Sequence, residues 1–233
     1  MRRASLLLIV LLLGACATVP DQTGGELRQT MGIDVTPQDA GDAPEVSYSA
    51  EVLMSRAEGY FQSKEFDQAA QEYARFLELH ATHPWASYAL YREGECYVRQ
   101  VKTPDREPAL PKKARQAFEN LIANYPDSPA VPHAREQRDW SVEQLALHDL
   151  GIARFYLRTH RAPAALERLN KLSEEFAETD AALDARLELG QALEDTGDLD
   201  GAMAAYESFL ALPDRDPKRR AAAQKARARL SAP

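Results

Sequence analysis

Residues 180–213 read DAALDARLELGQALEDTGDLDGAMAAYESFLALP, and this stretch decides the fold. The small residues Gly190 and Gly197 precede Ala202, and the large apolar Tyr206 follows four positions later. Apolar residues that recur every three or four positions indicate amphipathic helices. Small residues on the apolar face allow two helices to approach closely, and the large residue fills the space to the next pair. The stretch therefore predicts two closely packed helices joined by a turn.

The same pattern occurs three more times earlier in the chain. The alanine that marks each second helix lies at 69, 114, 165 and 202, so the repeats are 45, 51 and 37 residues apart. This pattern resembles the tetratricopeptide repeat, a helix–turn–helix unit of about 34 residues. The resemblance implies an all-α, right-handed solenoid of about four to five repeats within residues 47–233. The predicted repeats span 49–84, 85–127, 128–178 and 179–213, and a capping helix follows at 215–231.

Two segments explain the wide spacing of the middle repeats. Residues 103–111 contain three prolines, which disfavour helix, so we expect a loop there. Residues 131–160 contain no internal breaker beyond Pro132, which suits a first helical turn. This run predicts one helix of about 28 residues, roughly 42 Å long.

The N-terminus has the pattern of a targeting signal. A pair of arginines precedes the apolar run 4–13, which is too short to span a bilayer and is typical of a secretory signal. The run ends in Leu13-Gly14-Ala15-Cys16, which resembles the bacterial lipobox. This resemblance implies a signal peptide over 1–15 and a lipid anchor on Cys16. Alanine rather than aspartate at position 17 favours sorting to the outer membrane.

Residues 16–46 predict a lipidated, flexible tether. Glycines and prolines alternate there, and no apolar periodicity survives. A coil of about 30 residues would let the helical domain stand away from the membrane.

Composition and motifs exclude several classes of function. The formal net charge is −8, from 28 Lys and Arg against 36 Asp and Glu, which disfavours nucleic acid as a partner. Two cysteines are too few for a disulfide scaffold or an all-cysteine metal site, and Cys96 is expected to be a small buried apolar residue. His80 and His83 lack a third metal ligand at a suitable spacing, and no catalytic or phosphate-binding motif occurs. We therefore predict no enzyme activity, no cofactor and no metal site.

Several stretches outside the repeat pattern resemble the BamD family, the lipoproteins of the outer-membrane β-barrel assembly machinery. The resemblance covers about residues 47–210 and is strongest in the long third-repeat helix. The matching stretches are Thr82-His83-Pro84, Tyr88-Ala-Leu-Tyr91, Gly94-Glu-Cys-Tyr97, Pro104-Asp-Arg-Glu107, Ala123-Asn-Tyr-Pro-Asp-Ser128, Leu145-Ala-Leu-His-Asp149, Ala153-Arg-Phe-Tyr-Leu-Arg158 and Ala164-Ala165 with Arg168.

The resemblance implies a non-enzymatic lipoprotein on the periplasmic face of a Gram-negative outer membrane. Its expected partners are unfolded outer-membrane proteins, the barrel insertase BamA and the other lipoproteins of that machinery. The loop with Asp105 and Arg106 resembles the family's Asp-Arg loop and is a candidate partner contact. Here Glu107 and Pro108 depart from the family's pattern.

A repeat array binds its ligands on the concave face, which the first helix of each repeat lines. Counting repeat positions places Met54, Phe61, Tyr88 and Tyr91 on that face and predicts an aromatic half-groove for varied apolar peptides. Two alternatives stay open for these residues: they are core between repeats, or the tether covers them.

Arg154 lies on the same predicted face, further along the array. It is a candidate contact for a carboxylate of a partner, and the alternative is an ion pair with Asp149 or Glu194 of this chain.

Two other interpretations of the whole chain compete with this one. A lipid-anchored repeat adaptor of pilus secretin assembly or cell-envelope constriction would share the architecture but lack the Asp-Arg loop and the Leu-Ala-Leu-His-Asp run. A peptidoglycan enzyme would need a catalytic domain, and repeats occupy the chain after residue 47.

Overall fold

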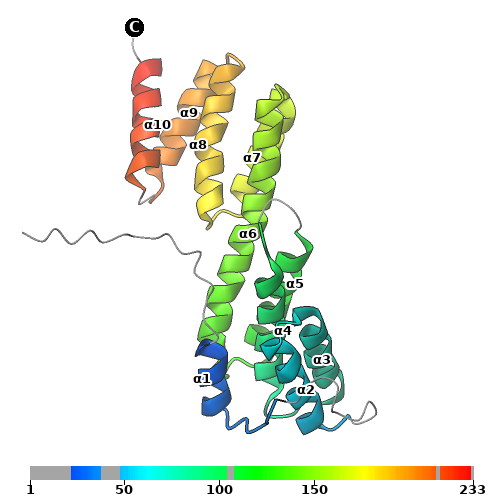
Figure 1. Cartoon of the computed structure of the whole chain (residues 1–233). Helices are drawn as coiled ribbons and strands as arrows, with labels where there is room; N and C mark the ends of the chain where they lie inside the picture. Colours follow the sequence, from blue (N-terminus) through cyan, green and yellow to red (C-terminus); the bar gives the residue numbers. More distant parts are fainter. Residues whose placement is uncertain (1–21, 38–47, 104–107, 214–215, 232–233) are drawn as a thin grey trace, which may run out of the picture.

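The computed structural model describes residues 22–37, 48–103, 108–213 and 216–231, and those residues form ten α-helices and no strand (Figure 1). The prediction of an all-α fold is confirmed. The helices are α1 (Gln22–Thr30), α2 (Ala50–Gln62), α3 (Phe66–Leu79), α4 (Ala86–Gln100), α5 (Ala109–Asn124), α6 (Val131–Arg158), α7 (Ala162–Glu175), α8 (Asp180–Asp195), α9 (Leu199–Ala211) and α10 (Pro217–Leu230).

From α2 onward the helices form consecutive pairs. The pairs α2–α3, α4–α5, α6–α7 and α8–α9 each lie within one of the repeats expected from the sequence, and α10 packs on α9. Side-chain oxygens cap the first turns of several helices, as Thr179 does for α8 by accepting from the amide of Ala182 at 3.1 Å. The chain is therefore the helical-repeat array that the spacing predicts.

Glycines allow the two helices of a pair to approach. A Cβ atom added to Gly94 of α4 would lie 2.6 Å from the Phe118 ring of α5. One added to Gly190 of α8 would lie 2.5 Å from the Tyr206 ring of α9. The repeat pattern has a small residue at these positions because the helix backbone there lies directly against an aromatic ring of the partner helix.

The long helix α6 has 28 residues, as expected for the run after Pro132, and it joins two parts of the molecule (Figure 1). Its first turn contributes Val131 and Ala134 to the core formed with α2–α5. Its second half contributes Leu150 and Ala153 to the core formed with α7 and α8. We call α1–α5 with the start of α6 the N-terminal lobe, and α7–α10 with the end of α6 the C-terminal lobe.

The proline-rich segment differs in part from the expected loop. Helix α5 begins at Ala109, so Leu110 and Pro111 lie inside its first turn. The amides of the first turn have no partner within the helix, so a proline there removes no helical hydrogen bond.

The expectation of a flexible tether over 16–46 is corrected for residues 22–37. Residues 22–30 form α1, and α1 contacts α4. The side chains of Leu27, Ile33 and Val35 are buried in the core of the N-terminal lobe. We call residues 22–37 the N-terminal strap, because they cover that core rather than stand away from it.

Candidate binding groove

Four residues expected in an open aromatic groove are buried in the N-terminal lobe. Met54 and Tyr88 have no exposed surface, and Phe61 and Tyr91 are only 5% and 3% exposed. They belong to one core that also contains residues of the strap, α3 and α5. The prediction of an open half-groove is therefore corrected: neighbouring helices and the strap fill the space beside these side chains.

At the centre of this core lies a carboxylate, Glu58 of α2, whose side chain is 3% exposed. It accepts hydrogen bonds from the hydroxyls of Tyr73 at 2.5 Å and Tyr88 at 2.8 Å, and Nε of Arg92 lies 3.3 Å away. Burial raises the pKa of both tyrosines well above the ordinary value, so both hydroxyls keep their protons and donate. We call these four residues the Glu58 cluster.

Arg92 of α4 supplies the positive charge of the Glu58 cluster. Its guanidinium lies 3.5 Å from the centre of the Phe61 ring, and Nη1 donates to Glu95 at 3.0 Å. Glu95 also accepts from Nη2 of Arg99 at 2.8 Å. A buried arginine needs such partners, because an uncompensated charge in a core is very costly. Sequence reasoning missed Arg92, although the spacing of Arg92, Glu95 and Arg99 along one helix is the signal that could have indicated an ion-pair series.

The strap closes this cluster on one side. Nη1 of Arg28 lies 3.6 Å from Glu58, and Nη2 of Arg28 donates to the carbonyl of Val35 at 2.7 Å. The hydroxyl of Ser55, one turn before Glu58 on α2, donates to the carbonyl of Thr36. The strap thus already covers the side of α2 that carries Ser55 and Glu58.

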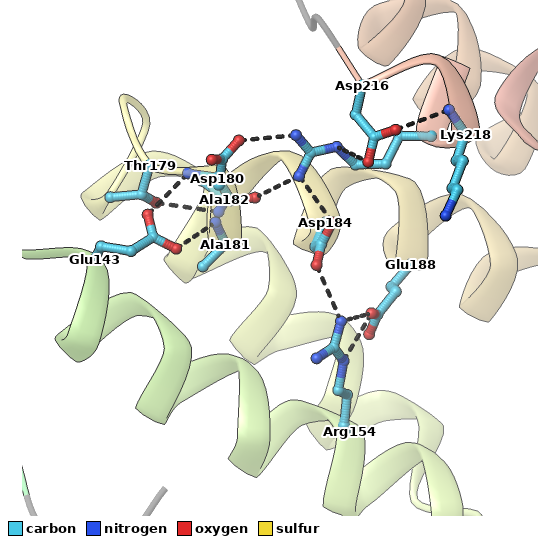
Figure 2. A network of polar contacts seen from close by, with 11 residues as sticks. Glu143, Arg154, Thr179, Asp180, Ala181, Ala182, Asp184, Glu188, Asp216 and Lys218 are labelled. Carbon is cyan, nitrogen blue, oxygen red and sulfur yellow. Dashed lines mark hydrogen bonds and ion pairs between the residues drawn. The ribbon is translucent and has the colours of Figure 1, made fainter. Parts of the chain in front are cut away.

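In the C-terminal lobe, Arg154 is used within the chain. It points from α6 toward α8, where Nε donates to Glu188 at 2.8 Å and Nη2 lies 3.2 Å from Asp184 (Figure 2). Neither Asp149 nor Glu194, the partners considered from the sequence, is the one that it contacts. Sequence reasoning missed both acidic partners, because the register between α6 and α8 is a tertiary property.

Asp184 extends this arrangement to α10. Arg219 of α10 donates to Asp184 at 3.1 Å and to Asp180 at 2.8 Å. Glu143 of α6 accepts from the amide of Asp180 at 2.9 Å and so caps the start of α8 (Figure 2). We call this the C-terminal ion network. It ties α6, α8 and α10 together and leaves Arg154 committed to acidic residues of its own chain.

The remaining predicted site residues lie outside the described part of the chain. These are Cys16, in the segment before residue 22, and Asp105 and Arg106, in the connection between α4 and α5. Within the described residues, no group of three or more His, Cys, Asp or Glu is placed to hold a metal ion. No helix in those same ranges is long and apolar enough to cross a bilayer.

His80 and His83 shape the turn between α3 and α4. Nε2 of His80 lies 2.7 Å from the carbonyl of Tyr48, and Nδ1 of His83 accepts from the amide of Trp85 at 3.2 Å. Cys96 has no exposed surface, as expected for a small apolar residue, and burial raises the pKa of its thiol.

Comparison with known proteins indicates which family the chain belongs to. The model of a family described as YfiO, outer membrane lipoprotein, matches residues 42–207, from before α2 into α9. Three curated relatives are each named outer membrane protein assembly factor BamD. That of Caulobacter vibrioides is 25% identical over 168 residues, which cover 70% of this chain and 55% of the relative. That of Vibrio cholerae is 29% identical over 160 residues, covering 63% and 66%, and that of Neisseria gonorrhoeae is 26% identical over 146 residues, covering 58% and 55%.

The chain thus spans between about half and two thirds of the length of these relatives. Among solved structures, a thermophilic TPR protein of Thermus thermophilus covers 76% of this chain and 98% of its own, at 16% identity and a TM-score of 0.31. The repeat architecture rests on the helix pairs themselves. Because the family model matches most of the chain and coincides with those pairs, this chain belongs to the YfiO/BamD family of outer-membrane lipoproteins.

Proposed function

We propose that this chain is a non-enzymatic lipoprotein of the β-barrel assembly machinery and helps outer-membrane proteins fold and insert. The observation that carries the proposal is the family match over residues 42–207, which coincides with the helix pairs that begin at α2. The names of the curated relatives support the same role. Helical-repeat arrays act by presenting extended surfaces to other proteins, which suits a scaffold rather than a catalyst.

The anchor in this proposal is a lipid on Cys16, which holds the chain on the periplasmic face of the outer membrane. The apolar run 4–13 and the small residues before Cys16 support the assignment. Two or three acyl chains give a stable anchor, whereas a single chain binds only marginally.

The proposed partners are a BamA-like insertase, the other lipoproteins of that machinery and unfolded outer-membrane proteins. Asp105 and Arg106 remain the proposed contact for a protein partner, in the connection between α4 and α5. Arg154 is no longer proposed for this role, because Glu188 and Asp184 already neutralise its charge.

A pull-down from detergent-solubilised outer membranes tests the proposal. The tagged full-length chain keeps Cys16, and bound proteins are identified by mass spectrometry. We expect a barrel protein with periplasmic repeats of the BamA type, and a chain with Asp105→Ala and Arg106→Ala should recover less of it. Recovery of a secretin or of division proteins without such a barrel would overturn the assembly role and favour the adaptor interpretation.

The anchor has its own test, with the second cysteine as the matched control. Cys16→Ser should release the chain from sedimented membranes. Cys96→Ser should leave it there, because Cys96 is buried in α4 and far along the chain from the lipobox. A Cys16→Ser chain that still sediments with membranes would contradict the anchor.

A further inference from the structure

The N-terminal strap has the contacts of a bound peptide. Three aliphatic side chains, those of Leu27, Ile33 and Val35, enter the core of the N-terminal lobe. One cation, Arg28, faces the Glu58 carboxylate, and Ser55 donates a hydrogen bond to the strap's backbone at Thr36. A mixture of apolar insertion, one ion pair and one backbone hydrogen bond is how a groove recognises a segment of another chain.

The strap's structure depends on the groove. Helix α1 has only nine residues and includes Gly24 and Gly25, whereas isolated helices shorter than about 12–15 residues are marginal even in favourable sequences. Glu26 and Gln29 on its outer side are exposed. A segment that gains its helix only from contacts with α2 and α4 loses that helix when it leaves them, so release is a local event that spares the helix pairs.

When the strap leaves, Glu58 loses Arg28 and Ser55 loses its acceptor at Thr36, but the other polar partners of Glu58 stay in place. Glu58 is held by the hydroxyls of Tyr73 and Tyr88 and by Arg92, none of which belongs to the strap. Arg92 is held in turn by Glu95. The Glu58 cluster is therefore preorganised to receive a second cation in the place of Arg28, and binding to a preorganised site loses little affinity to rearrangement.

We propose that the N-terminal strap is an intramolecular ligand of a peptide groove on the first repeat, and that an unfolded client segment displaces it. The client segment carries a lysine or arginine for Glu58, flanked by aliphatic side chains that take the places of Leu27, Ile33 and Val35. The identity of the client as an outer-membrane protein rests on the proposed function. The groove and its occupant do not.

The strap itself is the probe. A fluorescein-labelled synthetic peptide of residues 22–37, QTGGELRQTMGIDVTP, is titrated with the mature full chain in detergent, and its anisotropy is measured. The variant Leu27→Ala/Ile33→Ala weakens only the strap. We expect it to bind the labelled peptide about tenfold more tightly than the unsubstituted chain, because apparent affinity scales with the fraction of chains whose groove is open.

Matched controls separate release of the strap from damage to the lobe. The variant Glu26→Ala/Gln29→Ala changes exposed positions of α1 and should bind the peptide like the unsubstituted chain. Hydrogen exchange should show protection of residues 27–35 in the unsubstituted chain, its loss in Leu27→Ala/Ile33→Ala, and unchanged protection of α2 and α4 in both. A labelled peptide with Ala in place of Arg28 should bind more weakly to every variant.

Three results would overturn the proposal. One is equal affinity of Leu27→Ala/Ile33→Ala and the unsubstituted chain for the peptide. Another is unprotected exchange at residues 27–35 of the unsubstituted chain. The third is a dimer in light scattering that exchanges straps between copies, which would make the occupant a second chain.

The client is tested last, by competition. An unlabelled synthetic peptide from a porin strand of the host, chosen because an arginine or lysine lies between aliphatic residues, should displace the labelled strap peptide, and changing that cation to Ala should weaken the competition. If strap exchange works and no porin peptide competes, the client assignment falls. If the pull-down finds no barrel insertase while strap exchange works, the proposed function falls and the intramolecular ligand remains.

Discussion

The two lobes keep the same helix-pair pattern but hold their charges in different ways. In the N-terminal lobe, Arg92 and Glu58 are 1% and 3% exposed, and they lie among large aromatic side chains. In the C-terminal lobe, 41% of the Arg154 side chain is exposed, and the core beneath it is smaller and built largely from alanine and leucine. One lobe is organised around a buried ion cluster, and the other is tied together at its surface.

This difference teaches what each lobe can tolerate. In a buried ion pair, removal of one partner leaves an uncompensated charge in the core, which is strongly destabilising. Exposed ion pairs contribute little individually and are screened by salt. We therefore expect helices α2–α5 of the N-terminal lobe to keep one arrangement under the strap, and the stability of the C-terminal lobe to change with solution conditions.

The largest expected effect is in the N-terminal lobe. Glu58→Ala leaves Arg92 and two tyrosine hydroxyls without their shared acceptor, and we expect a loss of about 3–5 kcal/mol in the free energy of unfolding. Glu188→Ala in the C-terminal lobe should cost under about 1 kcal/mol, because Asp184 remains beside the exposed Arg154. Urea unfolding in a Trp140→Phe background measures both losses: Trp85 fluorescence reports on the N-terminal lobe, and circular dichroism reports on the helices of the whole chain. Equal losses would remove the distinction between the lobes.

The close approach of helices allows a comparison at equivalent positions. Gly94→Ala and Gly190→Ala each force a methyl group against an aromatic ring, at Phe118 and Tyr206. Overpacking costs about 1–3 kcal/mol, and the better helix propensity of alanine returns about 1 kcal/mol. We expect Gly94→Ala to lower the urea midpoint reported by Trp85 fluorescence. Gly190→Ala should leave that midpoint unchanged and lower the midpoint reported by circular dichroism, because the C-terminal lobe unfolds earlier.

Gly25→Ala is the control for these glycine variants. Apart from the backbone of α1 itself, no atom lies within 4 Å of its added Cβ, so only the gain in helix propensity remains. A loss of stability in Gly25→Ala, or none in Gly94→Ala, would contradict the packing explanation.

The salt dependence of stability also distinguishes the two lobes, with a smaller expected effect. Arg154→Ala should cost under about 1 kcal/mol at low ionic strength, and the difference from the unsubstituted chain should shrink in 1 M NaCl, where the Debye length is about 3 Å. The cost of Glu58→Ala should change little over the same range, because buried pairs are screened much less. Urea unfolding at two salt concentrations measures both. If the loss of stability in Arg154→Ala did not change with salt, the contacts of Arg154 would act by packing rather than by charge.

The smallest expected effect concerns pH in the N-terminal lobe. Burial raises the pKa of Glu93, against the hydrogen bond from Tyr97 and the charge of Lys113. Because the folded pKa lies above the unfolded one, protonation favours the folded state, and this contribution is lost as pH rises through the folded pKa. Glu93→Gln should therefore be more stable than the unsubstituted chain at pH 7 and lose that advantage below the unfolded pKa near 4.5. Denaturant midpoints at pH 4 and pH 7 check the sign.

Much of the fold was predictable because its signals are local. The period of 3.6 residues located the helix pairs, and the absence of breakers after Pro132 located α6. The failures are of another kind. Helix α1 has two glycines and no periodic pattern, so only its contacts with α2 and α4 make it a helix. Residues 109–111 begin α5 because prolines are tolerated in a first turn, which a count of prolines does not reveal.

The candidate site was less predictable than the fold. Repeat positions placed Tyr88 in an open groove, but the count showed neither that its side chain would be buried nor that the strap would pack beside Glu58 on the first repeat. The partner of Arg154 depends on the register of α8 against α6, which local spacing does not specify. The spacing within one helix shows which face of that helix a side chain lies on. The residue that it contacts lies on a different helix, which the spacing does not specify.

The sequence by itself determined the helix pairs, their close packing at Gly94 and Gly190, the acidic balance of the chain and the resemblance that indicates its family. These features follow from composition and from the spacing of residues within single segments of the chain. Only the tertiary structure decided that Arg92 is buried against Glu58, that Arg154 is committed to α8, and that residues 22–37 cover the first repeat. Each of these needs segments far apart in the chain to meet, because burial and charge pairing are properties of the assembled surfaces.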